Sequence, residues 1–335
     1  MTTLKAPASK PRQLLRRFLS LNGSGVFLAL VVYIVIISIA APRVNPNSNF
    51  LSFSNILTVL RQQSYIGLMA CGVTLVMITG NIDLSVGSAN AFLACVCAWG
   101  AATYGTVPAI AITLAAGLVC GVINGALVGY MGFNSFITTL GTGAIYGSLA
   151  VIFCTAVSGG YITPAANPSF EFIGRGSIGV IPMPVIILAA VVAICAVILR
   201  CTVYGQQLYA IGVNPQAAYN VGIKTRRNVA IAYAVTGLLC GLSAIVMVSN
   251  IMSASPTASS GKEMDVILAV VLGGTSIAGG KGSIGGTVLG FLFTGLLTTG
   301  FTFLSLNTYV QWVSMGVILI AALWLDVRKG RRTAL

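Results

Sequence analysis

Long apolar stretches follow one another along the chain and are separated by short polar or glycine-rich segments. A helix that crosses a bilayer needs ~20 mostly apolar residues. The pattern therefore predicts an all-α, polytopic membrane protein with about ten transmembrane helices. The ten stretches are Gly23–Pro42, Ser64–Gly80, Val86–Tyr104, Pro108–Met131, Phe136–Val157, Pro182–Leu199, Asn228–Ile251, Val266–Ala278, Gly285–Leu304 and Tyr309–Leu325. Two of them, Ser64–Gly80 and Val266–Ala278, are short, and the second is too short to cross a bilayer unless its flanks are helical or it is broken.

The composition agrees with a chain that is mostly immersed in lipid. Hydrophobic residues make up 57% of the sequence and charged residues only 7%, whereas a water-soluble domain is roughly 25% charged. The formal net charge is +13. The basic residues cluster at the termini and in one loop without interleaved aromatic residues, so we expect membrane lipid around the protein and no nucleic-acid partner.

The distribution of lysine and arginine predicts the orientation. Cytoplasmic segments of membrane proteins carry an excess of these residues. With ten spans and both termini in the cytoplasm, that side holds fourteen of the 18 basic residues, and only Arg43, Arg61, Arg175 and Lys262 fall on the other side. We therefore expect a cytoplasmic segment 1–22, a transmembrane domain 23–326 with a long cytoplasmic loop at 200–227, and a cytoplasmic basic tail 327–335.

The side chains that are missing exclude several kinds of chemistry. The chain has no histidine, which removes Ser–His and Cys–His catalysis and the commonest metal ligand. No two apolar spans contribute facing carboxylates, and no nucleotide-binding motif occurs. The eight cysteines lie in or beside apolar stretches, where we interpret them as small packing residues. We expect no catalytic site, no metal site and no cofactor in this chain. The five carboxylates are Asp83, Glu171, Glu263, Asp265 and Asp326.

A polar segment at residues 80–88 interrupts the apolar pattern and contains Asn81, Asp83, Ser85 and Ser88. One interpretation is structural: Asp83 or Ser85 caps the next helix by accepting hydrogen bonds from its first N–H groups. The other is functional: a broken span lines a pathway, where irregular backbone borders a cavity. The two interpretations are compatible.

A second interruption covers residues 272–286 and holds seven glycines in fifteen residues, with Gly273, Gly274, Thr275 and Ser276 at its start. Each glycine costs a helix about 1 kcal/mol relative to alanine, so no plain helix is expected here. A tight turn between close-packed spans and an unwound element beside a substrate route both fit.

The cytoplasmic loop contains a short helix with its own start and stop. Asn214 is a good N-cap, Pro215 fits the first helical position and Gly222 fits the position after the end. A two-turn helix is unstable alone in water and needs a surface to pack on. That surface is either the protein's own spans and membrane interface, or a docking partner.

At these places the sequence resembles the membrane permease subunits of the ribose/xylose/galactose-type ABC sugar importers, from about Leu51 to Asp326. The most specific pieces are Gly80–Ser88, Gly212–Arg227 and Glu263–Gly286, and Phe133–Gly141, which includes Asn134, also looks like the family pattern. The final third looks most like the ribose-type members.

The resemblance implies a permease of the bacterial inner membrane that forms the translocation pathway with a second permease, as a homodimer or heterodimer. It implies a periplasmic sugar-binding protein that delivers substrate and a cytoplasmic ATPase that binds ATP and magnesium. It further implies a coupling helix that seats in the ATPase, formed by Asn214, Pro215, Gln216, Ala217, Ala218, Tyr219, Asn220, Val221 and Gly222. Two residues depart from the pattern: Asn81 replaces the usual glycine, and Gln216 replaces a frequent glutamate.

The residue pattern and the resemblance favour the same function. A neutral sugar needs a conduit without charge, and charges within a membrane usually mark ion or proton routes. The main alternative is a secondary transporter coupled to H⁺ or Na⁺, for which Asp83 is the single weak candidate. A membrane-embedded enzyme is the third class, and the chain offers no plausible catalytic set for it.

Overall fold

The computed structural model describes residues 24–44, 49–307 and 309–320, and helices dominate it. The N-terminal half contains α2 (Ser24–Val44), α3 (Phe53–Ile78), α4 (Val86–Thr103), α5 (Thr106–Gly125), the π-helix η1 (Ala126–Tyr130) and α6 (Ser135–Ser158). Next come α7 (Pro168–Arg175), the two-residue strands β1 (Ser177–Ile178) and β2 (Ile181–Pro182), α8 (Met183–Cys201), α9 (Val203–Val213) and α10 (Pro215–Asn220). The last part contains α11 (Thr225–Ile251), α12 (Lys262–Leu272), α13 (Ile284–Phe303) and the helix Tyr309–Ile320. The expected cytoplasmic segments 1–22 and 327–335 lie outside the described residues, as does the end of the expected span Tyr309–Leu325.

Six helices in the described part of the chain are long and apolar enough to cross a membrane: α4, α5 with η1, α6, α8, α11 and α13. Shorter apolar helices lie at Leu30–Val44 and Tyr309–Ile320. The chain is therefore an all-α, polytopic membrane protein. Eight of the ten expected spans coincide with helices to within a few residues at their described ends.

Two expected spans have different bounds. The stretch Ser64–Gly80 is only the second part of α3, which begins at Phe53 because the Ser52 hydroxyl accepts a hydrogen bond from the N–H of Asn55 at 3.2 Å. The stretch Val266–Ala278 is wrong at both ends, since α12 begins at Lys262 and ends at Leu272, before the first glycine pair. With 11 residues α12 is about 16 Å long, roughly half of the apolar thickness of a bilayer.

The helices α4 and α11 form the centre of the bundle, with 72% of their most apolar windows buried, against 28% for α5, α6 and α8. Glycines allow α5 and α11 to approach closely. A Cβ atom on Gly121 would collide with the carbonyl oxygen of Tyr233, and one on Gly237 would collide with the backbone of Gly117 and Gly121. Such small residues at intervals of four let membrane helices pack backbone to backbone.

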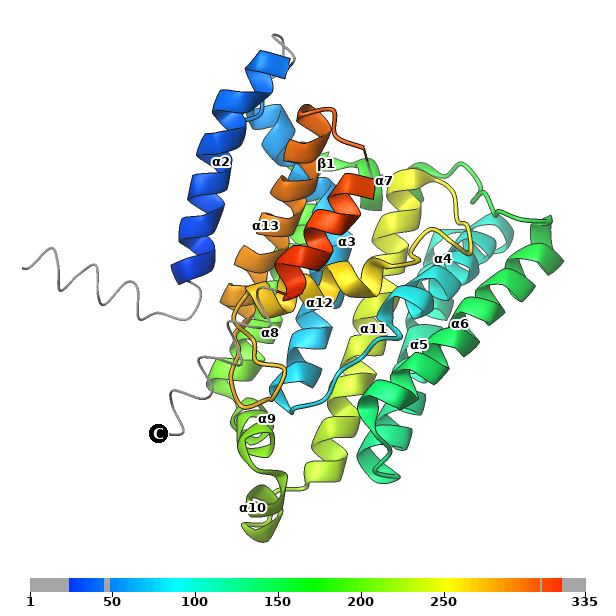
Figure 1. Cartoon of the computed structure of the whole chain (residues 1–335). Helices are drawn as coiled ribbons and strands as arrows, with labels where there is room; N and C mark the ends of the chain where they lie inside the picture. The colour runs from blue at the N-terminus through cyan, green and yellow to red at the C-terminus, as the bar shows by residue number, and fades with distance from the viewer. Residues whose placement is uncertain (1–23, 45–48, 308, 321–335) are drawn as a thin grey trace, which may run out of the picture.

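The order of elements repeats in the two halves. In the first half α3 is followed by an irregular segment at 79–85, then α4, α5 and α6; in the second half α11 is followed by an irregular segment at 252–261, then α12, α13 and the helix Tyr309–Ile320. In Figure 1, α3 and α11 run side by side in opposite directions, and α10 projects from the end of the bundle opposite to α7. The first turns of α4 and α12 consequently meet inside the bundle.

Candidate functional site

The irregular segment 79–85 is held in place by hydrogen bonds from three helices. The Tyr233 hydroxyl of α11 donates to the carbonyl oxygen of Ile82 at 2.9 Å, and the N–H of Leu84 donates to the Thr139 hydroxyl of α6 at 3.0 Å. From α5, the Asn124 amide donates to the Ser85 hydroxyl at 2.8 Å. Backbone polar groups without partners are costly inside a membrane, so these contacts are what allows the helix to stop here.

Asp83 closes a turn before α4. Its carboxylate is 3% exposed and accepts hydrogen bonds from the N–H and the hydroxyl of Ser85, at 2.9 and 2.6 Å. Asp83 therefore acts on the residue that immediately precedes α4. The expectation that Asp83 or Ser85 accepts hydrogen bonds from the first N–H groups of α4 is wrong. The Asp83 carboxylate bonds to Ser85, before the helix, and the Ser85 hydroxyl is engaged with Asp83 and Asn124 and makes no cap hydrogen bond.

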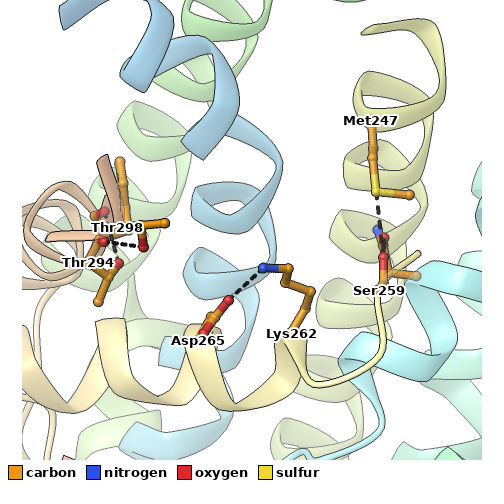
Figure 2. A network of polar contacts seen from close by, with 8 residues as sticks. Met247, Ser259, Lys262, Asp265, Thr294 and Thr298 are labelled. Atoms are coloured by element: carbon orange, nitrogen blue, oxygen red, sulfur yellow. Dashed lines mark hydrogen bonds and ion pairs between the residues drawn. The ribbon is translucent and has the colours of Figure 1, made fainter. Parts of the chain in front are cut away.

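The first turns of α4 and α12 cross at Gly87. A Cβ atom on Gly87 would collide with the Glu263 carboxylate and would lie 3.0 Å from both the N–H of Glu263 and the carbonyl oxygen of Ser259. The Ser259 hydroxyl donates to the Asn90 amide oxygen at 2.7 Å and lies 3.5 Å from the Met247 sulfur, as Figure 2 shows for Met247. Asn90 in turn donates to the Ser243 hydroxyl of α11 at 3.0 Å. The crossing is thus tied to the central helix.

A cavity with a volume of about 590 Å³ opens beside this crossing. We call it the larger cavity, in comparison with a cavity of about 350 Å³ that is described below. Ser88 of α4, Gly147 and Ser148 of α6, and Glu263 and Met264 of α12 contribute to its lining. One oxygen of the Glu263 carboxylate is buried and has no hydrogen-bond partner among the described residues. Ser88 was predicted to be a site residue, whereas Glu263 and Met264 were not. The signal that could have found Glu263 is its position: a carboxylate directly before an apolar run is a marker of a functional site in a membrane protein.

The other residues predicted for a pathway do not line this larger cavity. Asn134 is exposed and caps α6, accepting hydrogen bonds from the N–H groups of Phe136 and Ile137. Asn81 donates to the Thr79 hydroxyl at 2.9 Å. Gly273, Gly274, Thr275 and Ser276 form the turn that follows α12, and Thr275 is buried. The structure therefore gathers Asp83, Ser85 and Ser88 near the crossing but places the glycine-rich residues elsewhere.

The glycine-rich turn lies against the ends of α3 and α9. The N–H of Gly280 donates to the carbonyl oxygen of Ile78 at 2.9 Å. A Cβ atom on Gly279 would lie 2.7 Å from the nitrogen of Gly80 and 2.9 Å from the carbonyl oxygen of Gly212. We call this contact of Gly80, Gly212, Gly279 and Gly280 the glycine junction. It connects the end of α3, the last turn of α9 and the turn after α12 through their backbones, and Gly212 lies just before the start of α10.

The short helix α10 has the predicted start and stop. The Asn214 side chain accepts a hydrogen bond from the N–H of Ala217 at 3.0 Å, and Pro215 takes the first helical position. Gly222 follows the end with φ +87°, and the N–H groups of Gly222 and Ile223 donate to the carbonyl oxygens of Tyr219 and Ala218. These two bonds are the Schellman arrangement that commonly ends a helix at glycine.

The two faces of α10 have different surroundings. Ala218 is 4% exposed and packs into the hydrophobic cluster formed by α3, α8, α9 and α11. Tyr219 is 64% exposed and Val221 77% exposed. The interpretation that the helix packs on the protein's own spans is correct for Ala218. The large apolar side chains of Tyr219 and Val221 are instead exposed.

Buried polar breaks in an apolar helix bundle, with a cavity beside them, are typical of membrane transport proteins. Residues 55–323 match the family described as "Branched-chain amino acid transport system / permease component". The chain belongs to this family. It is therefore a multi-pass permease of the bacterial inner membrane.

Several relatives are similar to the chain over nearly their full length. The ribose import permease protein RbsC of Bacillus subtilis is 39% identical, over 91% of this chain and 92% of the relative. The probable ABC transporter permease protein YphD of Escherichia coli is 31% identical over 96% and 94%. The D-allose transport system permease protein AlsC of E. coli is 32% identical over 90% of both chains. No solved structure matches the chain.

Proposed function

We propose that the protein is the permease subunit of an ATP-driven importer for a monosaccharide of the ribose type. The observation that carries this proposal is the similarity to ribose import permeases over nine-tenths of both chains. The cavity beside the crossing fits a neutral hydroxylated solute, since serine hydroxyls and a carboxylate stand among small and apolar residues. Passage through a conduit requires weak binding, and this lining offers few polar side chains to a sugar.

The proposed topology has ten crossings with both termini in the cytoplasm. The six long apolar helices supply six of them, and α2, α3 and the helix Tyr309–Ile320 supply three. The tenth is α12 together with its irregular flanks. The parts are then a cytoplasmic segment 1–22, the transmembrane domain 23–326 and a cytoplasmic tail 327–335, and the bias of fourteen basic residues to four supports this orientation.

The proposed assembly contains two permease subunits, a cytoplasmic ATPase and a periplasmic binding protein. ATP and magnesium bind in the ATPase, and the permease itself is not an enzyme. The segment Asn214–Gly222 is the coupling helix, and its exposed Tyr219 and Val221, with the neighbouring Val213, form the docking surface. Three large apolar side chains that are 64–77% exposed at the tip of a loop favour a protein partner.

Reconstitution tests the function. The permease, its ATPase and its binding protein in liposomes should accumulate D-ribose or a similar aldose when ATP is supplied, and uptake should survive an uncoupler. The permease alone should hydrolyse no ATP and accumulate no sugar under an H⁺ or Na⁺ gradient. Accumulation by the permease alone would promote the secondary transporter and refute the importer.

A pair of substitutions tests the coupling helix. Val221→Asp should reduce co-purification of the ATPase, because a charge replaces an apolar group in a closed contact. Val180→Asp is the matched control: Val180 is 66% exposed in the turn between β1 and β2, at the opposite end of the bundle. Ala218→Arg is unsuitable, since Ala218 is buried in the protein's own core. Normal ATPase binding by Val221→Asp and Tyr219→Ala would count against this surface.

A further inference from the structure

A smaller cavity of about 350 Å³ lies on the other side of the first turn of α12. Its lining comes from α3, α11, α12, α13 and the helix Tyr309–Ile320. Glu263 and Met264 line the larger cavity, whereas Lys262 and Asp265, on the same turn, line the smaller one. The first turn of α12 therefore separates two cavities that share no lining residue.

The lining of the smaller cavity is polar and has no net charge. Lys262 and Asp265 form an ion pair at 2.8 Å, and their charges cancel. Figure 2 shows the two side chains directed at each other in front of α3, with Thr294 and Thr298 on α13. Amides and hydroxyls supply the remaining polar groups, among them Gln63 and Asn250. A lining of this kind favours a neutral ligand over an ion.

One of these groups lacks a partner. The amide oxygen of Gln63 is buried and has no hydrogen-bond partner among the described residues. The amide packs against Gly295 of α13, where a Cβ atom would collide with the Gln63 side chain. A buried acceptor without a donor costs about 1–3 kcal/mol. This unpaired acceptor belongs to a residue of the cavity wall, so a ligand hydroxyl that reached it would remove the cost.

The apolar part of the lining complements these groups. Ile66 of α3, Ile251 of α11 and Met315 of the helix Tyr309–Ile320 stand beside the amides and hydroxyls. A sugar offers hydroxyls at its edge and C–H groups on its face, and it matches a wall of this mixed kind. Cavities of ~300–1,000 Å³ are typical of small-molecule sites, so the volume of about 350 Å³ suits one monosaccharide.

We propose that the smaller cavity is a second binding site within one protomer, for a single neutral aldose. The sugar hydroxyls donate to the Gln63 oxygen and the Asp265 carboxylate, and they accept from Lys262 and Asn250. The identification of the ligand as the transported sugar rests on the proposed function. The site lies apart from the larger cavity, and the sugar binds there transiently beside the first turn of α12.

Sugar binding by the intact permease in nanodiscs, without the binding protein, tests the proposal. The probes are ¹³C-labelled D-ribose, D-xylose and D-allose, with L-leucine as the comparison ligand, and the readout is ligand-detected NMR titration. Gln63→Met keeps the length of the side chain and removes the amide, and it should weaken aldose binding at least fivefold. Asn250→Leu should act likewise. Gln206→Met, the same change at an exposed position of α9 that lines neither cavity, is the matched control and should leave the affinity within twofold. Ser88→Ala, in the wall of the larger cavity, reports on binding there.

Three results would overturn the proposal: no aldose binding by the folded wild-type permease at 100 mM, unchanged affinity in both variants at unchanged thermal stability, or loss of binding in Ser88→Ala alone. Vesicle uptake by the complete complex separates this failure from a failure of the proposed function. If the complex imports an aldose that the permease does not bind, the second site is refuted and the importer stands. If leucine binds and is imported instead, the sugar function itself is refuted.

Discussion

Replacing Asp83 tests whether its carboxylate works through hydrogen bonds or through its charge. The carboxylate is 3% exposed and accepts two hydrogen bonds from Ser85, at 2.9 and 2.6 Å. Asp83→Asn keeps an oxygen that can accept both bonds, whereas Asp83→Leu has a similar size and accepts none. The two variants therefore separate the acceptor from the charge and from the volume.

The expected magnitudes follow from these two bonds. Asp83→Leu leaves a buried N–H and a buried hydroxyl without their acceptor, and each costs about 1–3 kcal/mol. Removing a buried carboxylate also removes its desolvation cost, which offsets part of the loss. We expect a net loss of about 2–4 kcal/mol for Asp83→Leu and about 1 kcal/mol for Asp83→Asn, where neutral bonds replace charge-assisted ones.

The assay combines thermal stability with transport. In detergent, the midpoint of thermal unfolding should fall by roughly 4–8 °C in Asp83→Leu and by about 2 °C in Asp83→Asn, at about 2 °C per kcal/mol. In vesicles, the complete complex with Asp83→Asn should retain most of its uptake, and that with Asp83→Leu should lose it. If Asp83→Asn is stable and assembled but does not transport, the negative charge itself is needed and the reasoning fails.

Three further predictions concern packing, the polar break and the topology. Gly121→Ala should destabilise the protein by several kcal/mol, since its Cβ atom meets the Tyr233 carbonyl oxygen. Gly141→Ala has open space around it and should stabilise α6 by about 0.5–1 kcal/mol. Equal effects of the two changes on the unfolding midpoint would contradict the close packing of α5 on α11. Tyr233→Phe should cost about 1–3 kcal/mol, because the Ile82 carbonyl oxygen then keeps only the long 3.5 Å hydrogen bond from the Thr139 hydroxyl. Tyr146→Phe should cost less, because its acceptor, the Cys120 carbonyl oxygen, lies within α5; the reverse order would show that the break does not depend on Tyr233. On a cysteine-free background in intact cells, an impermeant thiol reagent should label Ser177→Cys in β1 and not Lys224→Cys beside α10; labelling at position 224 would refute the proposed orientation.

Much of the fold is readable from the sequence because lipid imposes a simple rule. Apolar runs such as Phe136–Val157 and Asn228–Ile251 are long enough to cross a bilayer and are stable only in its apolar core. The helices of the structure match these runs closely. The caps of α10 were equally predictable, since Asn214, Pro215 and Gly222 each act through local backbone geometry. The polar start of α3 was missed because Arg61, Gln62 and Gln63 interrupt the apolar run, although they line or adjoin an internal cavity.

The candidate site was harder to predict because it depends on which segments meet. The polar character of Asp83 and Ser85 was evident, but their partners Asn124, Thr139 and Tyr233 lie on three other helices and look like ordinary helix residues. Hydrophobic pattern gives the length of a helix and not its neighbours. For the same reason the sequence does not show that the glycine-rich turn contacts Gly80, or that α12 contributes to both cavity walls through its first turn.

The glycine junction has a mechanical consequence for the transport cycle. Side chains normally act as a compliant layer between helices, since they change rotamer when a neighbour moves. At Gly212, Gly279 and Gly80 that layer is missing, and peptide groups bear directly on one another. In the proposed complex, a displacement of α9 by the ATPase would therefore be passed directly to the end of α3, which leads into the break at Asp83, and to the turn that follows α12. A movement of α10 would then reach both irregular segments at the same time, because the same backbone contacts link α9 to each of them.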